Sequence, residues 1–147
     1  MGMRYTLKVY PAGLGRDVYR VIEISGSDNL DRLCRTVLTA FDFIDEHLYE
    51  FNMDNKMYRS CCSYKSDPEG NQLSTKTKLE KLQLVKGQKF SLHYDYGDDW
   101  MFTINVQKIT EELGHTTPRF MKEKGMVKQY PNMDDEDEWD EDDGEDE

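Results

Sequence analysis

The sequence predicts an α+β domain in which a mainly antiparallel sheet packs on one amphipathic helix. Several short segments alternate apolar and polar residues, as strands with one buried face do. A single segment repeats its apolar residues at helical spacing. The strand-like segments precede and follow this helix instead of alternating with several helices, which is typical of an α+β order. The order is β-grasp-like, with additions at the C-terminal end.

The N-terminal part predicts two strands and then the helix. Residues 5–10 alternate, 11–15 carry Pro and Gly as a turn does, and 18–24 are rich in β-branched residues. In the helix, apolar residues fall at i, i+3, i+4, i+7, i+8 and i+11, namely Leu30, Leu33, Cys34, Val37, Leu38 and Phe41. Ser27 or Asp28 is the predicted N-cap.

The middle and the end of the chain carry weaker patterns. Residues 48–53 predict a third strand, and a fourth is expected to begin at Met57. Residues 60–78 are polar and include Asp67-Pro68-Glu69-Gly70, which indicates a long surface loop. Leu79, Leu82, Leu84 and Val85 predict a short helical turn that closes the core. Residues 118–126 predict a small helix or an extended arm.

The most informative segment is a hairpin at residues 89–106. Its first strand alternates Phe90, Leu92, Tyr94 and Tyr96, and its second alternates Trp100, Phe102, Ile104 and Val106. Gly97-Asp98-Asp99 between them predicts a three-residue loop, in which Gly97 supplies a positive φ angle. This loop would place Tyr96 opposite Trp100 and Tyr94 opposite Phe102, so that all eight apolar side chains share one face.

Charge divides the chain into two parts. Residues 134–147 hold twelve of the 30 Asp and Glu and no Lys or Arg, so 18 acidic and 19 basic residues remain, a net charge of +1. We therefore expect a single α+β domain over residues 1–130 and a disordered acidic tail over 131–147. A near-neutral domain and an acidic tail disfavour direct binding of nucleic acid. Trp139 and the surrounding carboxylates could alternatively dock on a basic protein surface.

The sequence lacks the marks of a membrane, secreted or nucleotide-binding protein. It contains no apolar run of about 18 residues and no apolar stretch of a secretory signal, so a cytoplasmic location is expected. Cys34 lies on the apolar stripe of the helix and is expected in the core, whereas adjacent Cys61 and Cys62 lack zinc or redox spacing. No P-loop, dinucleotide fingerprint or serine nucleophile motif is present.

Three stretches together resemble the plasmid pRiA4b ORF-3-like family of small bacterial and archaeal proteins. These are Leu38-Thr39-Ala40-Phe41, His47-Leu48-Tyr49-Glu50-Phe51 and the Tyr94-Asp95-Tyr96-Gly97-Asp98-Asp99-Trp100 run. The resemblance covers roughly residues 3–125. It associates the chain in name with plasmids and mobile elements and implies no activity, cofactor or catalytic residue. A Pro-Pro-Glu-Asp-Cys-Gly-Gly stretch, common in the family after the counterpart of residues 118–125, is absent here.

Candidate functional residues gather at the hairpin tip. Tyr96, Gly97 and Trp100, with His47, are the candidate surface for a ligand or partner, because aromatic residues are enriched at recognition surfaces. Packing in the core is the alternative for the aromatic residues. Oxygen ligands converging from a turn suit a divalent cation, so Asp95, Asp98 and Asp99 are candidate metal ligands. Hydrogen bonding to loop N–H groups is the alternative, favoured role for these aspartates.

The sequence leaves three functions open. The first is a non-enzymatic module that recognises a protein or peptide, with no cofactor. The second is a small metal-dependent enzyme in which the tip aspartates hold the ion and His47 or His93 moves a proton. The third is an accessory factor of a mobile element that meets nucleic acid only through a protein partner. No set of residues complete for one reaction class supports the second function, so recognition is the preferred hypothesis.

Overall fold

A computed structural model describes residues 2–55 and 63–129 of the chain. In chain order the elements begin with β1 (Gly2–Pro11), β2 (Tyr19–Ser25), helix α1 (Leu30–Ala40) and β3 (Tyr49–Asn52). They continue with β4 (Ser63–Lys65), β5 (Leu73–Ser74), the 3-10 helix η2 (Leu79–Leu82), β6 (Lys89–Tyr94), β7 (Trp100–Glu112) and β8 (Arg119–Lys124). No helix among these residues is long and apolar enough to cross a membrane.

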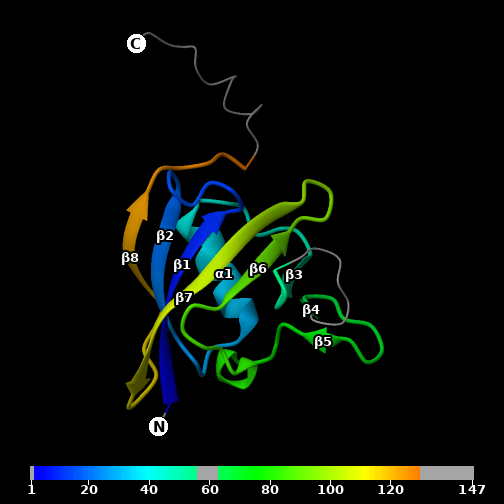
Figure 1. Cartoon of the computed structure of the whole chain (residues 1–147). Helices are drawn as coiled ribbons and strands as arrows, with labels where there is room; N and C mark the ends of the chain where they lie inside the picture. The colour runs from blue at the N-terminus through cyan, green and yellow to red at the C-terminus, as the bar shows by residue number, and fades with distance from the viewer. Residues whose placement is uncertain (1, 56–62, 130–147) are drawn as a thin grey trace.

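The eight described strands form one open sheet in the order β5-β4-β3-β6-β7-β1-β2-β8. Helix α1 lies against one face of this sheet, and β8 and β5 lie at its two edges (Figure 1). The α+β class predicted from the sequence is therefore present. The sheet is mixed, because β4 and β5 run parallel while the other described pairs are antiparallel. The β-grasp order is not confirmed, and β1 runs antiparallel to both of its neighbours.

The helix packs its apolar stripe on the sheet as its spacing predicts. Leu30, Leu33, Cys34, Val37, Leu38 and Phe41 are all buried. Burial raises the pKa of the Cys34 thiol well above its usual value, in keeping with a core position. The predicted N-cap is wrong: Asn29 is the cap, and its Oδ1 accepts the backbone N–H of Arg32 at 2.8 Å. Ser27 and Asp28 lie in the preceding turn.

The predicted hairpin is present, but its register differs from the prediction. Tyr94 pairs with Trp100, Leu92 with Phe102 and Phe90 with Ile104, so the loop has five residues instead of three. A shift by two residues keeps the side-chain parity, because side chains alternate with a period of two. Seven of the eight apolar residues consequently keep the predicted face, and Tyr96 leaves the strand.

Two other expectations change in the middle of the chain. The polar segment 60–78 is more than a surface loop, because β4 and β5 form within it and extend the sheet beyond β3. The expected beginning of a strand at Met57, with Cys61 and Cys62, lies outside the described residues. The helical turn near Leu79 is present as η2, and residues 118–126 contain the extended strand β8.

Asp31 joins the start of the helix to β3 and to the segment before η2. Its Oδ1 accepts hydrogen bonds from Tyr49 Oη and Thr75 Oγ1, each at 2.5 Å, and Lys76 Nζ lies 3.0 Å from its Oδ2. Burial acts to raise the pKa of Asp31, but hydrogen bonds from Thr75, Tyr49 and Lys76 outweigh burial and lower the pKa. The ionised carboxylate therefore stabilises the packing of three elements.

Replacing Asp31 by Asn tests this junction. We expect Asp31→Asn to lower the free energy of unfolding at pH 7 by about 1.5–3 kcal/mol, the usual contribution of hydrogen bonds to a charged group. Because folding lowers the pKa of Asp31, its contribution is complete above the unfolded value of about 3.9 and is lost as pH falls through the folded value. Urea denaturation should show a difference between the two proteins that narrows below about pH 4. An equal difference at pH 7 and pH 3 would contradict this role.

Candidate functional site

Polar side chains gather on the sheet face opposite α1, where β3, β4 and β6 adjoin. Register pairs Glu50 with both His93 and Lys65, and Asn52 with both Ser91 and Ser63, so these side chains share one face. We call the buried members of this set the polar cluster: Glu50, Asn52, Ser63, Ser91 and His93. Polar side chains this deeply buried require partners within the protein.

His93 is the centre of the polar cluster and has no exposed surface. Its Nδ1 lies 2.8 Å from Glu50 Oε2, and its Nε2 lies 2.6 Å from Asp99 Oδ1. Lys65 Nζ donates to Glu50 Oε1 at 2.7 Å. The four side chains thus form a chain of ionic hydrogen bonds that joins β4, β3 and β6 to the hairpin loop. Both ring nitrogens are engaged, so the chain holds the imidazole ring in a single orientation.

The hairpin loop is shaped by two aspartates. Asp95 and Asp99 have φ angles of 66° and 53°, a left-handed conformation that aspartate tolerates better than most residues. Gly97 was predicted to supply the positive φ angle, and this prediction is wrong. Asp95 Oδ1 accepts the backbone N–H groups of Gly97 at 3.1 Å and Asp98 at 3.4 Å. Asp95 therefore has the backbone-bonding role that was its favoured alternative.

His47 approaches the same loop from the segment before β3. Its Nε2 lies 3.4 Å from Asp95 Oδ2 and 3.5 Å from Glu46 Oε2. The His47 ring packs edge-on against Tyr94, with 5.6 Å between ring centroids. The buried Tyr94 hydroxyl donates to the Ile44 carbonyl and accepts the N–H groups of Glu46 and His47. The segment before β3 is thereby fixed to the end of β6.

The structure separates the two aromatic residues of the predicted recognition surface. Trp100 is half-buried on the core face, stacked on Phe102 and edge-on to Phe43. Tyr96 packs instead on His93, which belongs to the opposite face, with 5.1 Å between ring centroids. The longer loop causes this separation, because Tyr96 no longer follows the alternation of β6. Tyr96 and Trp100 accordingly do not form one continuous surface.

The candidate metal ligands do not point to a common centre. The Asp95 and Asp99 carboxylates contact different histidines, His47 and His93, and Asp98 lies exposed at the tip. Among residues 2–55 and 63–129, no group of three or more His, Cys, Asp or Glu side chains is arranged to hold a metal ion.

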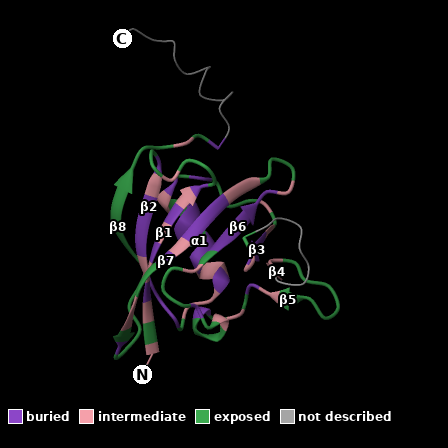
Figure 2. Cartoon of the chain, viewed as in Figure 1, coloured by how far each residue is buried: buried purple, intermediate pink, exposed green. Residues whose placement is uncertain are grey.

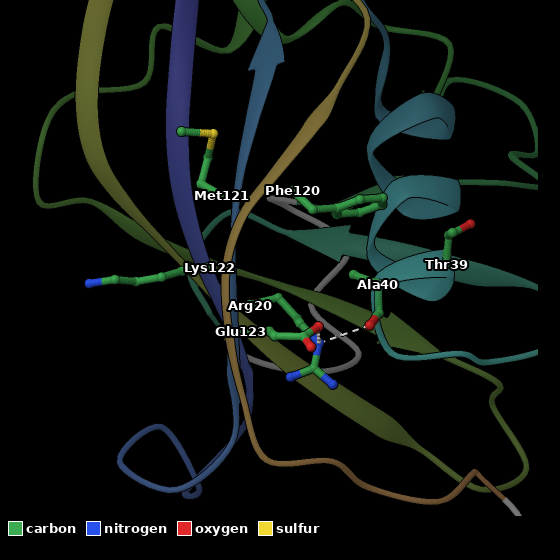
Figure 3. A pocket seen from close by; sticks show the side chains of 7 residues that line it. All are labelled: Arg20, Thr39, Ala40, Phe120, Met121, Lys122 and Glu123. Atoms are coloured by element: carbon green, nitrogen blue, oxygen red, sulfur yellow. Dashed lines mark hydrogen bonds and ion pairs between the residues drawn. The ribbon is translucent and has the colours of Figure 1, made fainter.

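A groove of about 420 Å³ lies between β8 and the C-terminal end of α1 (Figure 3). Phe120 borders it from β8 and points toward the helix, while Thr39 and Ala40 border it from the last turn of the helix. Phe120 is 56% exposed. A β-bulge lies beside this groove, since Val21 pairs with Lys122 and Ile22 with Phe120, which leaves Met121 as the extra residue.

Arg20 forms the floor of this groove and fixes its walls. The buried guanidinium donates from Nε to the Ala40 carbonyl at 2.8 Å and from Nη1 to the Lys124 carbonyl at 3.0 Å. It also lies 4.6 Å from the centroid of the Phe41 ring. A cation at the C-terminus of a helix interacts favourably with the helix dipole. Arg20 thus holds the helix end and the end of β8 at a set separation.

Sequence reasoning missed Arg20, Glu50, Lys65 and Phe120 as residues of these sites. The alternation of side chains along β2 is the one signal for Arg20, because it places Arg20 on the same face as the buried Ile22 and Ile24. Glu50 alternates with Tyr49 and Phe51, so its opposite orientation can be predicted, but its pairing with His93 requires the strand register. Lys65 and Phe120 lie in β4 and β8, two strands that show no apolar alternation in the sequence.

The chain matches known proteins only at the level of family and fold. The sequence profile of the plasmid pRiA4b ORF-3-like protein matches residues 3–134. The chain belongs to this family. A crystal structure of a protein of unknown function, MM3350 from Methanosarcina mazei Go1, is similar with a TM-score of 0.66 and 23% identity. The similarity covers 84% of this chain and 70% of MM3350, and at that identity it shows the fold alone. No curated protein matches the chain.

Removing His93 tests the ionic chain in the polar cluster. We expect His93→Gln to lower the free energy of unfolding by about 1–3 kcal/mol, because it leaves the buried Glu50 carboxylate without one of its hydrogen-bond partners. Urea denaturation at neutral pH measures this change. Asp98→Asn, at the exposed tip of the same loop, is the matched control and should change stability by less than about 0.5 kcal/mol. Equal stability of His93→Gln and the control would contradict the role of the chain.

Proposed function

We propose that this member of the plasmid pRiA4b ORF-3-like family is a non-enzymatic module that binds an extended segment of a partner protein along β8. The observation that carries the proposal is the exposure of this strand. Among the described residues β8 pairs only with β2, and all six of its residues are exposed (Figure 2). Its outer backbone N–H and C=O groups can accept a further strand, which is a recurrent mode of peptide recognition.

The groove beside β8 supplies a place for one side chain of the partner. Residues that alternate along an added strand point to opposite faces, so one of them can enter the space between Phe120 and the end of α1. An apolar side chain suits contact with Phe120. Arg20 keeps the two walls of the groove apart through bonds to both of them, so the site is already formed before binding.

The charge of β8 indicates the kind of segment that fits. The strand contains Arg119, Lys122 and Lys124 against Glu123, and Arg119 lies 3.9 Å from Glu23 of β2. Lys124 Nζ donates to the Arg16 carbonyl at 2.9 Å and remains a cation at the end of the strand. A partner segment with carboxylates flanking its apolar residue would complement this strand.

The contacts at the hairpin tip support recognition over catalysis. His93 is fully buried between two carboxylates, which leaves it without access to a substrate. Asp95 is engaged with loop N–H groups. The hairpin tip, with Tyr96 on one face and Trp100 on the other, stays a second candidate for partner binding, and the experiment below distinguishes it from β8.

Selection from a displayed library of random peptides on the full chain tests the proposal. The enriched peptides should carry an apolar residue flanked by Asp or Glu. Phe120→Ser should weaken their binding about tenfold or more in fluorescence anisotropy, because a buried aromatic contact at an interface contributes more than about 1.4 kcal/mol.

Two control variants complete this experiment. Leu113→Ser alters an equally apolar residue that is 91% exposed outside the groove and should leave the affinity unchanged. Tyr96→Ser alters the hairpin tip and should also leave it unchanged. Peptides that bind Phe120→Ser as tightly as the wild type, or that lose binding to Tyr96→Ser, would place recognition away from β8.

A further inference from the structure

The sheet face opposite α1 changes character from one end of the sheet to the other. At the β3 and β6 end it holds the polar cluster. At the β7, β1, β2 and β8 end it forms a second groove of about 430 Å³. We call this end the open face, after the residues that line the groove: Thr6, Lys8, Tyr19, Val21, Glu23, Gln107, Lys108, Met121 and Lys122.

Basic residues dominate the charge of the open face. Lys8, Lys108 and Lys122 come from three different strands and are brought together only by the order β7-β1-β2-β8. Glu23 is the acidic residue in the lining, and its carboxylate lies 3.9 Å from Arg119 Nη1. The domain as a whole is near neutral, but its lysines outnumber its acidic residues on this face.

The floor of the open face is aromatic and apolar. Lys8 Nζ lies 4.7 Å from the centroid of the Tyr19 ring and 5.6 Å from that of Tyr10. Val21 and Met121 adjoin Tyr19 in the groove lining. Such a surface can contact an indole ring while the surrounding ammonium groups pair with carboxylates.

The same chain supplies a segment of matching chemistry. Residues 134–147 contain twelve Asp or Glu, with Trp139 among them and no Lys or Arg. Eighteen residues follow Gln129, the last described residue, and can span up to about 60 Å. A domain of this size has a radius of gyration of about 14 Å, so the segment can reach any face. Covalent attachment gives it a high effective concentration at the open face.

We infer that residues 134–147 bind in cis to the open face, with carboxylates against Lys8, Lys108 and Lys122 and Trp139 against Tyr19 and Val21. This contact shields the basic groove from external anions. Because it depends on charges at the surface, it weakens as salt shortens the range of the electrostatic interaction.

Zero-length carbodiimide cross-linking of the full chain, read by mass spectrometry, tests this contact. Tail carboxylates should join to Lys8, Lys108 and Lys122 several-fold more than to Lys78 and Lys81, exposed lysines near η2. Raising the salt to 1 M should abolish the preference. Mixing ¹⁵N-labelled and unlabelled protein should give links within one chain only. Equal linkage to all lysines, or links mainly between chains, would overturn the inference.

A pair of matched variants gives a second, independent measurement. In ¹H–¹⁵N spectra of the full chain, Lys8→Gln/Lys122→Gln should shift the Trp139 indole signal and the amide signals of residues 134–147. Lys78→Gln/Lys81→Gln removes the same charge elsewhere and should leave these signals in place. Tail signals that respond to neither pair, or equally to both, would overturn the inference. So would tight binding of a single-stranded oligonucleotide by the unmodified chain, since it would show that the face is open to external phosphates.

Discussion

A single helix covers the apolar face of a wide sheet, and this constraint organises the rest of the described structure. The central strands bury Leu7, Ile104 and Leu92 against the apolar stripe of α1. One helix is narrower than eight strands, so it leaves the outer strands and the whole opposite face of the sheet uncovered. Three features lie in the area that α1 does not cover: the ionic chain of the polar cluster, the basic open face and the exposed edge strand β8.

The ionic chain stabilises the part of the sheet where the hairpin loop returns. Glu50, His93 and Asp99 are hydrogen-bonded in series, and Lys65 balances one of the two carboxylates. Burying these charges is costly unless each has a partner, so the benefit of the chain is the fixed position of the loop relative to β3 and β4. Through Tyr94, Asp95 and Asp99, the most recognisable motif of the sequence, Tyr94 to Trp100, is thereby built into the fold.

In contrast to the buried polar cluster, the edge strand β8 is exposed to solvent. Arg20 and a close approach of backbone at Gly125 hold this strand in place, because a Cβ at Gly125 would lie 2.4 Å from the Asp17 carbonyl oxygen. The strand nevertheless keeps its side chains exposed on both faces. A rigidly placed but uncovered strand is well suited to bind another segment without reorganisation.

Much of this arrangement follows from residue patterns, and the remainder depends on register. Spacing predicts α1 and its buried residues, and alternation predicts the hairpin and its apolar face. The length of the loop could not be predicted, because three and five residues give the same parity and only the contacts of Asp95 and Asp99 distinguish them. The residues of β8 predict a small helix or an extended arm without distinguishing the two, because an exposed strand shows no apolar alternation.

Native-state hydrogen exchange of the full chain tests most directly the claim that the sheet is fixed at its centre and uncovered at β8. The account predicts that amides of β6 and β7 near His93 exchange only through global unfolding. Amides of β8 that point away from β2 should exchange orders of magnitude faster in the same sample. Protection of these β8 amides equal to that of β6 would show that the edge is covered in the native protein, and would contradict the account.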